Sequence, residues 1–380
     1  MAVFIQFLFF ITLAGLCLFS YGYIDPGLAL SSDKLFMTLQ APLKYLAYLD
    51  RPVATSIFAV LLIVLFVCYL YLVRFGKQIF TSWKKIALTL AAAAFILAFA
   101  YPALTYDLFN YMATAKVAYT YHENPYLVMP VEIPNDPNLA FTRAANKVAL
   151  YGPVWLAITA IPHYLGGENV WRTIVVFKLM NAAVYLGFCY FIWRLTRNLT
   201  NVMFFALNPL VLIEVVMNGH NDIYMMFLAL GALALWRNGT LRSRVVAGLL
   251  LFASWWVKGA TLVFTPLFFL KNVSWDRLAL AAYCLLSLVF FIVAPIREEL
   301  YPWYAVWLVS TASLLTFKSY RFIYWFTIVL SFALELRNLP YMWMGYYEGP
   351  GPFLRTLVTI VPIMVFISWY VWKKIRRQSF

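Results

Sequence analysis

Two long apolar runs, "VATSIFAVLLIVLFVCYLYLV" (53–73) and "IALTLAAAAFILAFAYPAL" (86–104), set the narrowest limit on what this chain can fold into. Each run is close to the 20 or so residues that a helix needs to cross roughly 30 Å of hydrocarbon. Lipid offers the backbone no hydrogen-bond partners, so segments of this kind satisfy their own peptide groups as helices. The rest of the chain has the same character, with 64% hydrophobic and 12% charged residues. The sequence therefore predicts an all-α polytopic membrane protein.

The apolar runs predict ten to twelve membrane spans. Ten spans follow directly from the runs: 4–22, 53–73, 86–103, 172–193, 201–217, 222–236, 278–296, 303–317, 321–335 and 354–372. Two further stretches do not fit a simple alternation across the bilayer. We expect 151–166 to be re-entrant or to lie at the membrane interface. We expect 245–270 to form either two short helices that meet at "VKGA" or a single span.

The basic residues predict which connections face the cytoplasm. They cluster in short connections: Arg74, Lys77, Lys84 and Lys85; Arg194 and Arg197; Arg237, Arg242 and Arg244; Lys271 and Arg277; Lys318 and Arg321; and "KKIRR" at 373–377. Lysine and arginine accumulate on the cytoplasmic side of membrane proteins, next to anionic lipid. The net charge of +14 is therefore a topology signal, and nucleic acid is not an expected partner. The C-terminus is predicted to be cytoplasmic, in a multi-pass protein of the plasma membrane.

The remaining connections are predicted to lie outside: 23–51, 104–171, 217–222, 297–303 and 337–352. We treat residues 1–380 as one transmembrane domain with three parts. The N-terminal spans occupy 1–103, an outer loop with interfacial or re-entrant helices occupies 104–171, and the other spans occupy 172–380.

The stretch "YDLFNYMATAKVAYTYHENPY" (106–126) is polar and aromatic, although it follows an apolar run directly. Residues 106–121 are predicted to form a helix on the membrane surface, and Pro125 disfavours helix at the preceding residue. Asp107 lies close to the end of the preceding span. It is either the N-cap of this helix or a functional group, because ionisable residues near the bilayer are costly unless they have a task.

The second acidic stretch is "NGHND" (218–222), with Glu214 one turn before it. It is predicted to be a polar turn between an outward and an inward helix. A turn does not require His220, Asn221 and Asp222 together, so these residues are either turn formers or contacts for a ligand. As a metal site the stretch is weak, because no second His or Cys stands at ligand spacing.

Three groups of basic residues outside the cytoplasmic clusters are candidates for an anionic ligand. Lys258 interrupts the apolar run "LLLFASWWVKGATLVFTP", and such a lysine either snorkels or faces a cavity or an anion. Arg297 either anchors the outer interface beside Trp303 and Tyr304 or contacts the ligand. Arg143 and Lys147, in the long outer loop, are expected to be solvated or to contact phosphate.

Together these residues predict a reaction class. A carboxylate can accept a proton from a hydroxyl, and a fixed cation can hold a departing phosphate. Two acids, a cation and an aromatic loop at one face indicate group transfer from a lipid-borne phosphate donor at the outer leaflet.

Five motifs in this order resemble those of the GT-C fold glycosyltransferases that use polyprenyl-phosphate sugars. They are "YDLFNY…ENPY" (106–126), "YGPVW" (151–155), "LNPLVLIE…NGHND" (207–222), "WWVKGA" (255–260) and "YPWYAVW" (301–307). The resemblance is strongest to polyprenol-phosphate-mannose-dependent mannosyltransferases and runs from about residue 100 to 310.

The resemblance implies roles for individual residues. Asp107 would be the acidic residue that activates the acceptor hydroxyl, as a general base. Asp222, with His220, Asn221 and Glu214, would form a second acidic site near the acceptor. Lys258 and Arg297 would bind the donor phosphate. The donor or lipid groove would be lined by Asn110, Tyr111, Tyr126, Tyr151 and Tyr304.

The chain departs from the family pattern in two respects. More than one span precedes the outer loop, where many relatives have one. The Asp-x-Asp pair of some members is missing, so no cofactor is expected, and a bound Mg²⁺ or Mn²⁺ is not favoured.

The predicted function is thus an inverting, GT-C type transfer of a hexose, with mannose favoured, from a polyprenyl-phosphate sugar to a hydroxyl of a lipid or glycan acceptor outside the cell. A transporter or flippase of polyprenyl-linked sugars is the main alternative. It would use the same cavity without a general base, and internal repeats would favour it. A structural subunit of an envelope-assembly complex is a third alternative.

Overall fold

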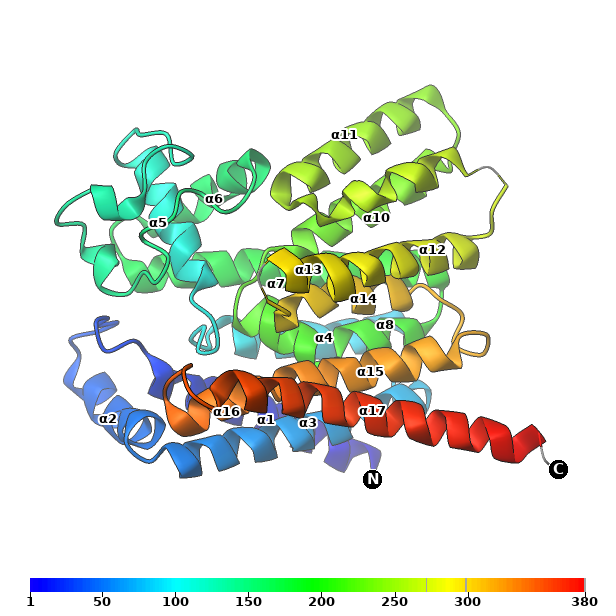
Figure 1. Cartoon of the computed structure of the whole chain (residues 1–380), viewed down its shortest axis with the longest axis horizontal. Helices are drawn as coiled ribbons and strands as arrows, with labels where there is room; N and C mark the ends of the chain where they lie inside the picture. The colour runs from blue at the N-terminus through cyan, green and yellow to red at the C-terminus, as the bar shows by residue number, and fades with distance from the viewer. Residues whose placement is uncertain (271, 298, 379–380) are drawn as a thin grey trace.

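The structure is a computed structural model that describes residues 1–270, 272–297 and 299–378. Its regular elements within those residues are all helices, as predicted (Figure 1). In chain order the α-helices are α1 (Ala2–Ser20), α2 (Lys34–Tyr48), α3 (Arg51–Ile79), α4 (Trp83–Ala98), α5 (Asp107–Tyr119), α6 (Pro153–Gly166), α7 (Val170–Thr196), α8 (Leu199–Ala206), α9 (Pro209–Val211), α10 (Asp222–Trp236), α11 (Leu241–Val257), α12 (Trp275–Leu288), α13 (Ala294–Arg297), α14 (Ala305–Ala312), α15 (Arg321–Glu335), α16 (Asn338–Met344) and α17 (Gly351–Gln378). The all-α membrane fold predicted from the apolar runs is confirmed.

Six helical segments in the described chain are long and apolar enough to cross a membrane. They are α1 with the turn after it, α3, α7, α12 continued to Ile296, α15 continued through α16, and α17. A seventh span results if α8 and the helix Pro209–Met217, which meet at a 54° bend, count as one. The chain is therefore a multi-pass membrane protein.

The predicted number of ten to twelve spans is higher than these helix lengths support. At about 1.5 Å per residue, α4, α10 and α11 are about 22 to 26 Å long, which is less than the roughly 30 Å of a hydrocarbon core. The helix in the apolar run 303–317 is shorter still, because α14 has 8 residues. The prediction counted apolar residues, whereas helices end inside those runs. In the run 86–104, α4 stops at Ala98, before Pro102.

The two stretches that did not fit the predicted alternation are both short helices. Residues 151–166 form α6, which has 14 residues and packs against α5, α7 and α11. Residues 245–270 form two helices, as the first alternative predicted: α11 and a 3₁₀-helix, Gly259–Phe269. They meet at Lys258, whose backbone is extended (φ −161°, ψ 124°).

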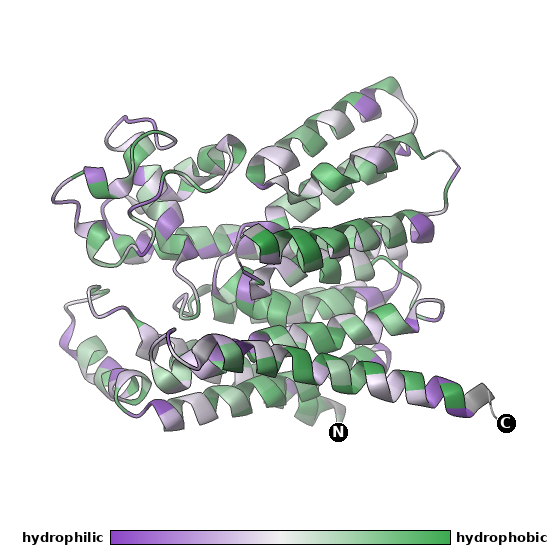
Figure 2. Cartoon of the chain, in the orientation of Figure 1, coloured by the Kyte–Doolittle hydropathy of each residue, from purple (hydrophilic) through white to green (hydrophobic). Residues whose placement is uncertain are grey.

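Hydrophilic residues lie mainly toward the two ends of the bundle, and apolar residues lie between them (Figures 1 and 2). Helices α2, α5 and α6 and their loops lie at one end, where hydrophilic residues gather, while α17 runs to a C-terminus at the opposite end. We call the first of these the α5 end. Helix α5 was predicted to rest on the membrane surface, but seven of its thirteen residues are buried within the protein.

The centre of the bundle is the chain from α8 to α10. Every residue from 201 to 226 is buried. The segment from α9 continues as a π-helix, Leu212–Met217, before the turn at 218–221 reverses the chain into α10. The predicted outward helix, polar turn and inward helix are therefore present, but the turn lies inside the protein.

Candidate active site

Asp107 is the first residue of α5, and its side chain does not cap the helix. Tyr106 occupies the N-cap position, and the Asp107 backbone N–H donates to the Thr105 hydroxyl (3.1 Å). The carboxylate turns to other partners instead. The Tyr151 hydroxyl donates to Asp107 Oδ2 at 2.6 Å, and His220 Nδ1 lies 3.4 Å from the same oxygen. The Asp107 side chain keeps 18% of its surface exposed. Of the two roles predicted for Asp107, that of helix N-cap is therefore wrong.

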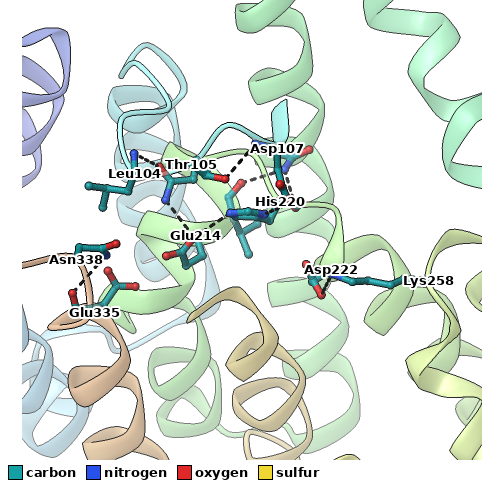
Figure 3. Close-up of polar contacts among 12 residues, drawn as sticks. Leu104, Thr105, Asp107, Glu214, His220, Asp222, Lys258, Glu335 and Asn338 are labelled. Atoms are coloured by element: carbon teal, nitrogen blue, oxygen red, sulfur yellow. Dashed lines mark hydrogen bonds and ion pairs between the residues drawn. The ribbon is translucent and has the colours of Figure 1, made fainter. Parts of the chain in front are cut away.

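His220 lies between two carboxylates (Figure 3). Its Nδ1 faces Asp107, and its Nε2 is 3.1 Å from Glu214 Oε2. The ring of Trp303 stacks on the imidazole, with centroids 4.0 Å apart and planes at 19°. The His220 side chain has no exposed surface. A doubly protonated imidazolium has a donor on each nitrogen, so it fits between two acceptors.

The ionisation of these groups follows from their contacts. Burial lowers the pKa of His220, but the carboxylates of Asp107 and Glu214 outweigh it and raise the pKa to about 9. Burial raises the pKa of Asp107, but His220 and the Tyr151 hydroxyl outweigh it and hold that pKa below its ordinary value. Burial, and next the nearby Asp107 charge, place the pKa of Tyr151 well above its usual range. At neutral pH the site therefore holds an ionised Asp107 beside an imidazolium.

Backbone geometry positions His220. Gly219 has a φ of +85°, a conformation that residues with a Cβ rarely adopt. A Cβ added there would also lie 2.6 Å from Leu108 Cδ1 in α5. Asn181 of α7 donates from its amide to the carbonyl oxygens of Val215 and His220, both at 3.0 Å. These contacts hold the turn against both α5 and α7.

A second ion pair lies at the start of α10. Lys258 Nζ is 2.9 Å from Asp222 Oδ1, and the Trp307 indole N–H donates to the same oxygen at 2.6 Å. The Lys258 ammonium also lies 4.5 Å from the centroid of the Tyr304 ring. The side chain of Asp222 is fully buried and that of Lys258 is 15% exposed. Two residues that were expected to have separate tasks thus neutralise each other.

A glycine joins the two pairs. The Gly152 N–H donates to the Val257 carbonyl oxygen (3.3 Å), directly beside Lys258. A Cβ at Gly152 would lie 2.1 Å from the Trp256 carbonyl oxygen, so only glycine permits this approach. Tyr151, which donates to Asp107, is therefore tied to the junction of α11 and the 3₁₀-helix.

Comparison with known families identifies the class of protein. A family model described as alpha-(1->6)-mannopyranosyltransferase, N-terminal domain, matches residues 10–273, which are more than two thirds of the chain. The chain belongs to the MptA_B family of mannosyltransferases. The protein is thus a glycosyltransferase that transfers mannose, which confirms the predicted class, and its substrates are a sugar donor and a glycan acceptor. No curated protein and no solved structure matches the chain.

The residues predicted to line a donor groove in this mannosyltransferase have different surroundings. Tyr151 contacts Asp107, and Tyr111 packs edge-on against the Tyr151 ring (4.9 Å). Asn110 instead accepts from the Ala144 N–H (3.2 Å), and the Tyr126 hydroxyl donates to the Tyr151 carbonyl oxygen (3.0 Å). The last two therefore hold the loop around the site.

Asn221 and Arg297 were also predicted to belong to the site. Asn221 is fully buried, and its amide atoms have no hydrogen-bond partner within the described chain. Arg297 ends α13, and its side chain lies outside the described part of the structure. No group of three or more His, Cys, Asp and Glu residues in the described chain is arranged to hold a metal ion.

Four charged residues of the mannosyltransferase that lie near the α5 end were not named among the site residues predicted from the sequence. Glu335 lies beside Glu214 in the interior (Figure 3), and Arg337, two residues later, pairs with Glu299. Arg355, at the start of α17, pairs with the same Glu299 oxygen at 2.9 Å. The sequence "FALELRN" (332–338) contained a usable signal, because an acid in an apolar run is costly unless it has a task. Arg355 carried no such signal, since it follows a polar connection.

Proposed function

We propose that this mannosyltransferase moves mannose from a polyprenyl phosphate to an acceptor hydroxyl, with inversion at the anomeric carbon. The acceptor oxygen attacks that carbon, and its proton passes to the Asp107 carboxylate. The bond between the anomeric carbon and the phosphate oxygen breaks, and polyprenyl phosphate leaves with the electron pair. Phosphate is a stable leaving group, so the step needs little general-acid assistance.

The observation that carries this proposal is the state of Asp107. Its carboxylate is ionised, held by Tyr151 and His220, and partly exposed. A base needs a free lone pair, a fixed orientation and access to the acceptor. The lowered pKa makes Asp107 a weak base, which is sufficient when a good leaving group departs in the same step. The His220 imidazolium then stabilises the negative charge on Asp107 before the reaction.

Inversion sets the anomer of the donor. The family description names an α-(1→6) mannosyl transfer. An inverting enzyme forms an α-linkage from a β-linked donor, so the substrate would be a β-mannosyl phosphate carried by a polyprenyl chain. The acceptor would be a primary hydroxyl at position 6 of a mannose residue in a glycan.

The side of the membrane follows from charge. Basic clusters occupy the connections at the end of the bundle opposite to α5, including the C-terminal "KKIRR". The positive-inside rule assigns that end to the cytoplasm. The α5 end with Asp107 would then face outside, at the level of the outer leaflet of the plasma membrane. We propose that no bound metal is needed, because both His220 nitrogens already face carboxylates and the Asp-x-Asp pair is missing.

The test is transfer of radiolabelled mannose from polyprenyl-phosphate mannose by the purified protein, with glucose and arabinose donors in parallel. Replacing the base, Asp107→Asn, should lower turnover by about 10² to 10⁴, the usual contribution of general-base catalysis, and leave donor binding unchanged. Asp33→Asn is the matched control, because Asp33 caps α2 away from the site and Asn caps equally well. Turnover by Asp107→Asn near the wild-type rate would refute the assignment. Donor binding without transfer from any donor would favour the transporter.

A further inference from the structure

Two arginines from different helices converge on one glutamate at the α5 end of the bundle. Arg337, at the N-cap of α16, pairs with Glu299, and so does Arg355 of α17 at 2.9 Å. Both guanidinium groups contact the same oxygen, Oε1. The side chains of Arg337 and Arg355 are 7% and 17% exposed, and that of Glu299 is 36% exposed. We call these three residues the arginine cluster.

The arginine cluster has more donors than acceptors. Arg337 also donates to the Thr359 hydroxyl (3.1 Å), and the Arg355 guanidinium lies 5.5 Å from the Tyr347 ring centroid. Yet both Nε–H groups are buried with no hydrogen-bond partner among the residues that the structure describes. A buried donor without a partner costs about 1–3 kcal/mol, and more when it is charged. Two cations held by one carboxylate and two unfilled donors are the composition of an anion site.

A row of stacked rings connects the arginine cluster to the catalytic residues. Tyr301 lies close enough to Arg337 to interact with its charge. The Tyr301 ring stacks on Trp303, with centroids 4.4 Å apart and planes at 8°. Trp303 in turn stacks on His220, which contacts Asp107. A row of packed rings therefore joins the arginine cluster to His220, the neighbour of the proposed base.

The cluster is also next to the part of the bundle most open to lipid. Only 11% of the apolar window of α17 is buried inside the protein, against 33% to 50% for the other five spans. Arg355 is in the first turns of this helix. A ligand whose phosphate reaches Arg355 can therefore keep its hydrocarbon chain against α17, within the bilayer.

We propose that Arg337 and Arg355 bind the phosphate of the lipid-linked donor, and that Glu299 occupies the site until the donor arrives. The inference rests on the proposed function, since it names the residues that hold the donor. Guanidinium groups bind phosphate oxygens through paired, charge-assisted hydrogen bonds, and a phosphate supplies the acceptors that the Nε–H groups lack. Breakage of the glycosidic bond adds negative charge to this phosphate, so the same contacts stabilise the leaving group.

The test measures binding of polyprenyl phosphate, the product without sugar, to the full chain in nanodiscs. Arg355→Gln should weaken binding at least tenfold, whereas Glu299→Gln should tighten it because a competing carboxylate is lost. Arg337→Lys keeps the charge but not the paired geometry, and should also weaken binding. Arg244→Gln, at the start of α11, is the control and should bind as the wild type does. Thermal unfolding of each variant checks that the fold persists.

The outcomes separate this inference from the proposed function. If the wild type transfers mannose and binds polyprenyl phosphate, but Arg355→Gln and Arg337→Lys bind it equally well, the cluster is not the donor site and the function stands. If the wild type neither binds polyprenyl phosphate nor transfers mannose, both fail. Inorganic phosphate and phosphatidylglycerol are added as competitors. Displacement by phosphatidylglycerol at the same concentration as polyprenyl phosphate would identify a general anionic-lipid site and overturn the assignment to the donor.

Discussion

Replacing Lys258 by methionine should destabilise the protein by about 3 kcal/mol, mainly because it leaves the Asp222 carboxylate buried without its cation. At an effective dielectric constant of about 20, two unit charges about 3 Å apart attract each other by about 5 kcal/mol. Two contacts remain after the change. The Trp307 indole still donates to Asp222, and Asp222 is the first residue of α10, where the helix dipole favours an anion. Together they offset about 2 kcal/mol.

Two further variants complete a double-mutant cycle for this ion pair. Asp222→Asn should destabilise the protein by only about 1–2 kcal/mol. The Lys258 ammonium that it leaves unpaired is partly exposed to solvent and keeps its contact with the Tyr304 ring. The double variant Lys258→Met/Asp222→Asn should cost less than the sum of the single changes by about 2 kcal/mol, since neither charge is then unpaired. Lys147→Met, at an exposed lysine of the outer loop, should have no measurable effect.

The assay is reversible denaturation in mixed micelles, followed by tryptophan emission, with polyprenyl-phosphate binding measured in parallel. A loss of stability below about 1 kcal/mol for Lys258→Met would refute the reasoning, because a carboxylate that is buried without its cation should destabilise the fold by more than that. The binding measurement tests the role predicted from the sequence. Loss of donor affinity in the stable double variant would mean that Lys258 contacts the phosphate itself. Retained affinity would mean that the pair shapes the site without touching the donor.

Three further expectations concern pH, packing and metal. Because the pKa of His220 is raised from 6.5 to about 9, its ion pairs stabilise the fold fully below about pH 6.5, and about 3 kcal/mol is lost as pH rises through 9. His220→Gln should flatten the thermal unfolding profile over that window, and an unchanged slope would contradict the ion pairs. Gly152→Ala should lower stability by about 1–3 kcal/mol in the same denaturation assay, because its Cβ would collide with the Trp256 carbonyl. Transfer activity should survive EDTA, and full loss restored by Mn²⁺ would instead make Asp222 a metal ligand.

The fold class could be predicted from the sequence because a membrane helix is indicated by the apolarity of its own consecutive residues. Apolar runs predicted the helices, and "NGHND" predicted the reversal between α9 and α10. "VKGA" predicted the break at Lys258, where the structure has extended backbone. Helix lengths were harder to predict, because a proline or a turn can end a helix inside an apolar run that continues beyond it.

The candidate site was predictable only in part. Asp107 and His220 were named because polar residues at the ends of apolar runs are conspicuous. Their contact depends on the packing of α5 against the buried turn, and no local pattern records it. The pairing of Lys258 with Asp222 spans 36 positions and was hidden for the same reason. The arginine cluster joins Glu299, which follows α13, to Arg337 at the N-cap of α16 and Arg355 of α17, and both arginines follow the region on which the family resemblance rested.

The exposed position of α17 makes the thickness of the bilayer a variable of this protein. Its 28 residues extend about 42 Å, which exceeds a hydrocarbon core of roughly 30 Å, so the helix must tilt or carry its ends beyond the core. A helix with so few protein neighbours follows the surrounding lipid, and thicker membranes bring it closer to upright. Arg355 would then shift in height relative to Glu299 and Arg337, which belong to better-packed parts of the chain. Membranes of different acyl length should therefore change how well the two guanidinium groups line up, even though no residue of the protein has changed.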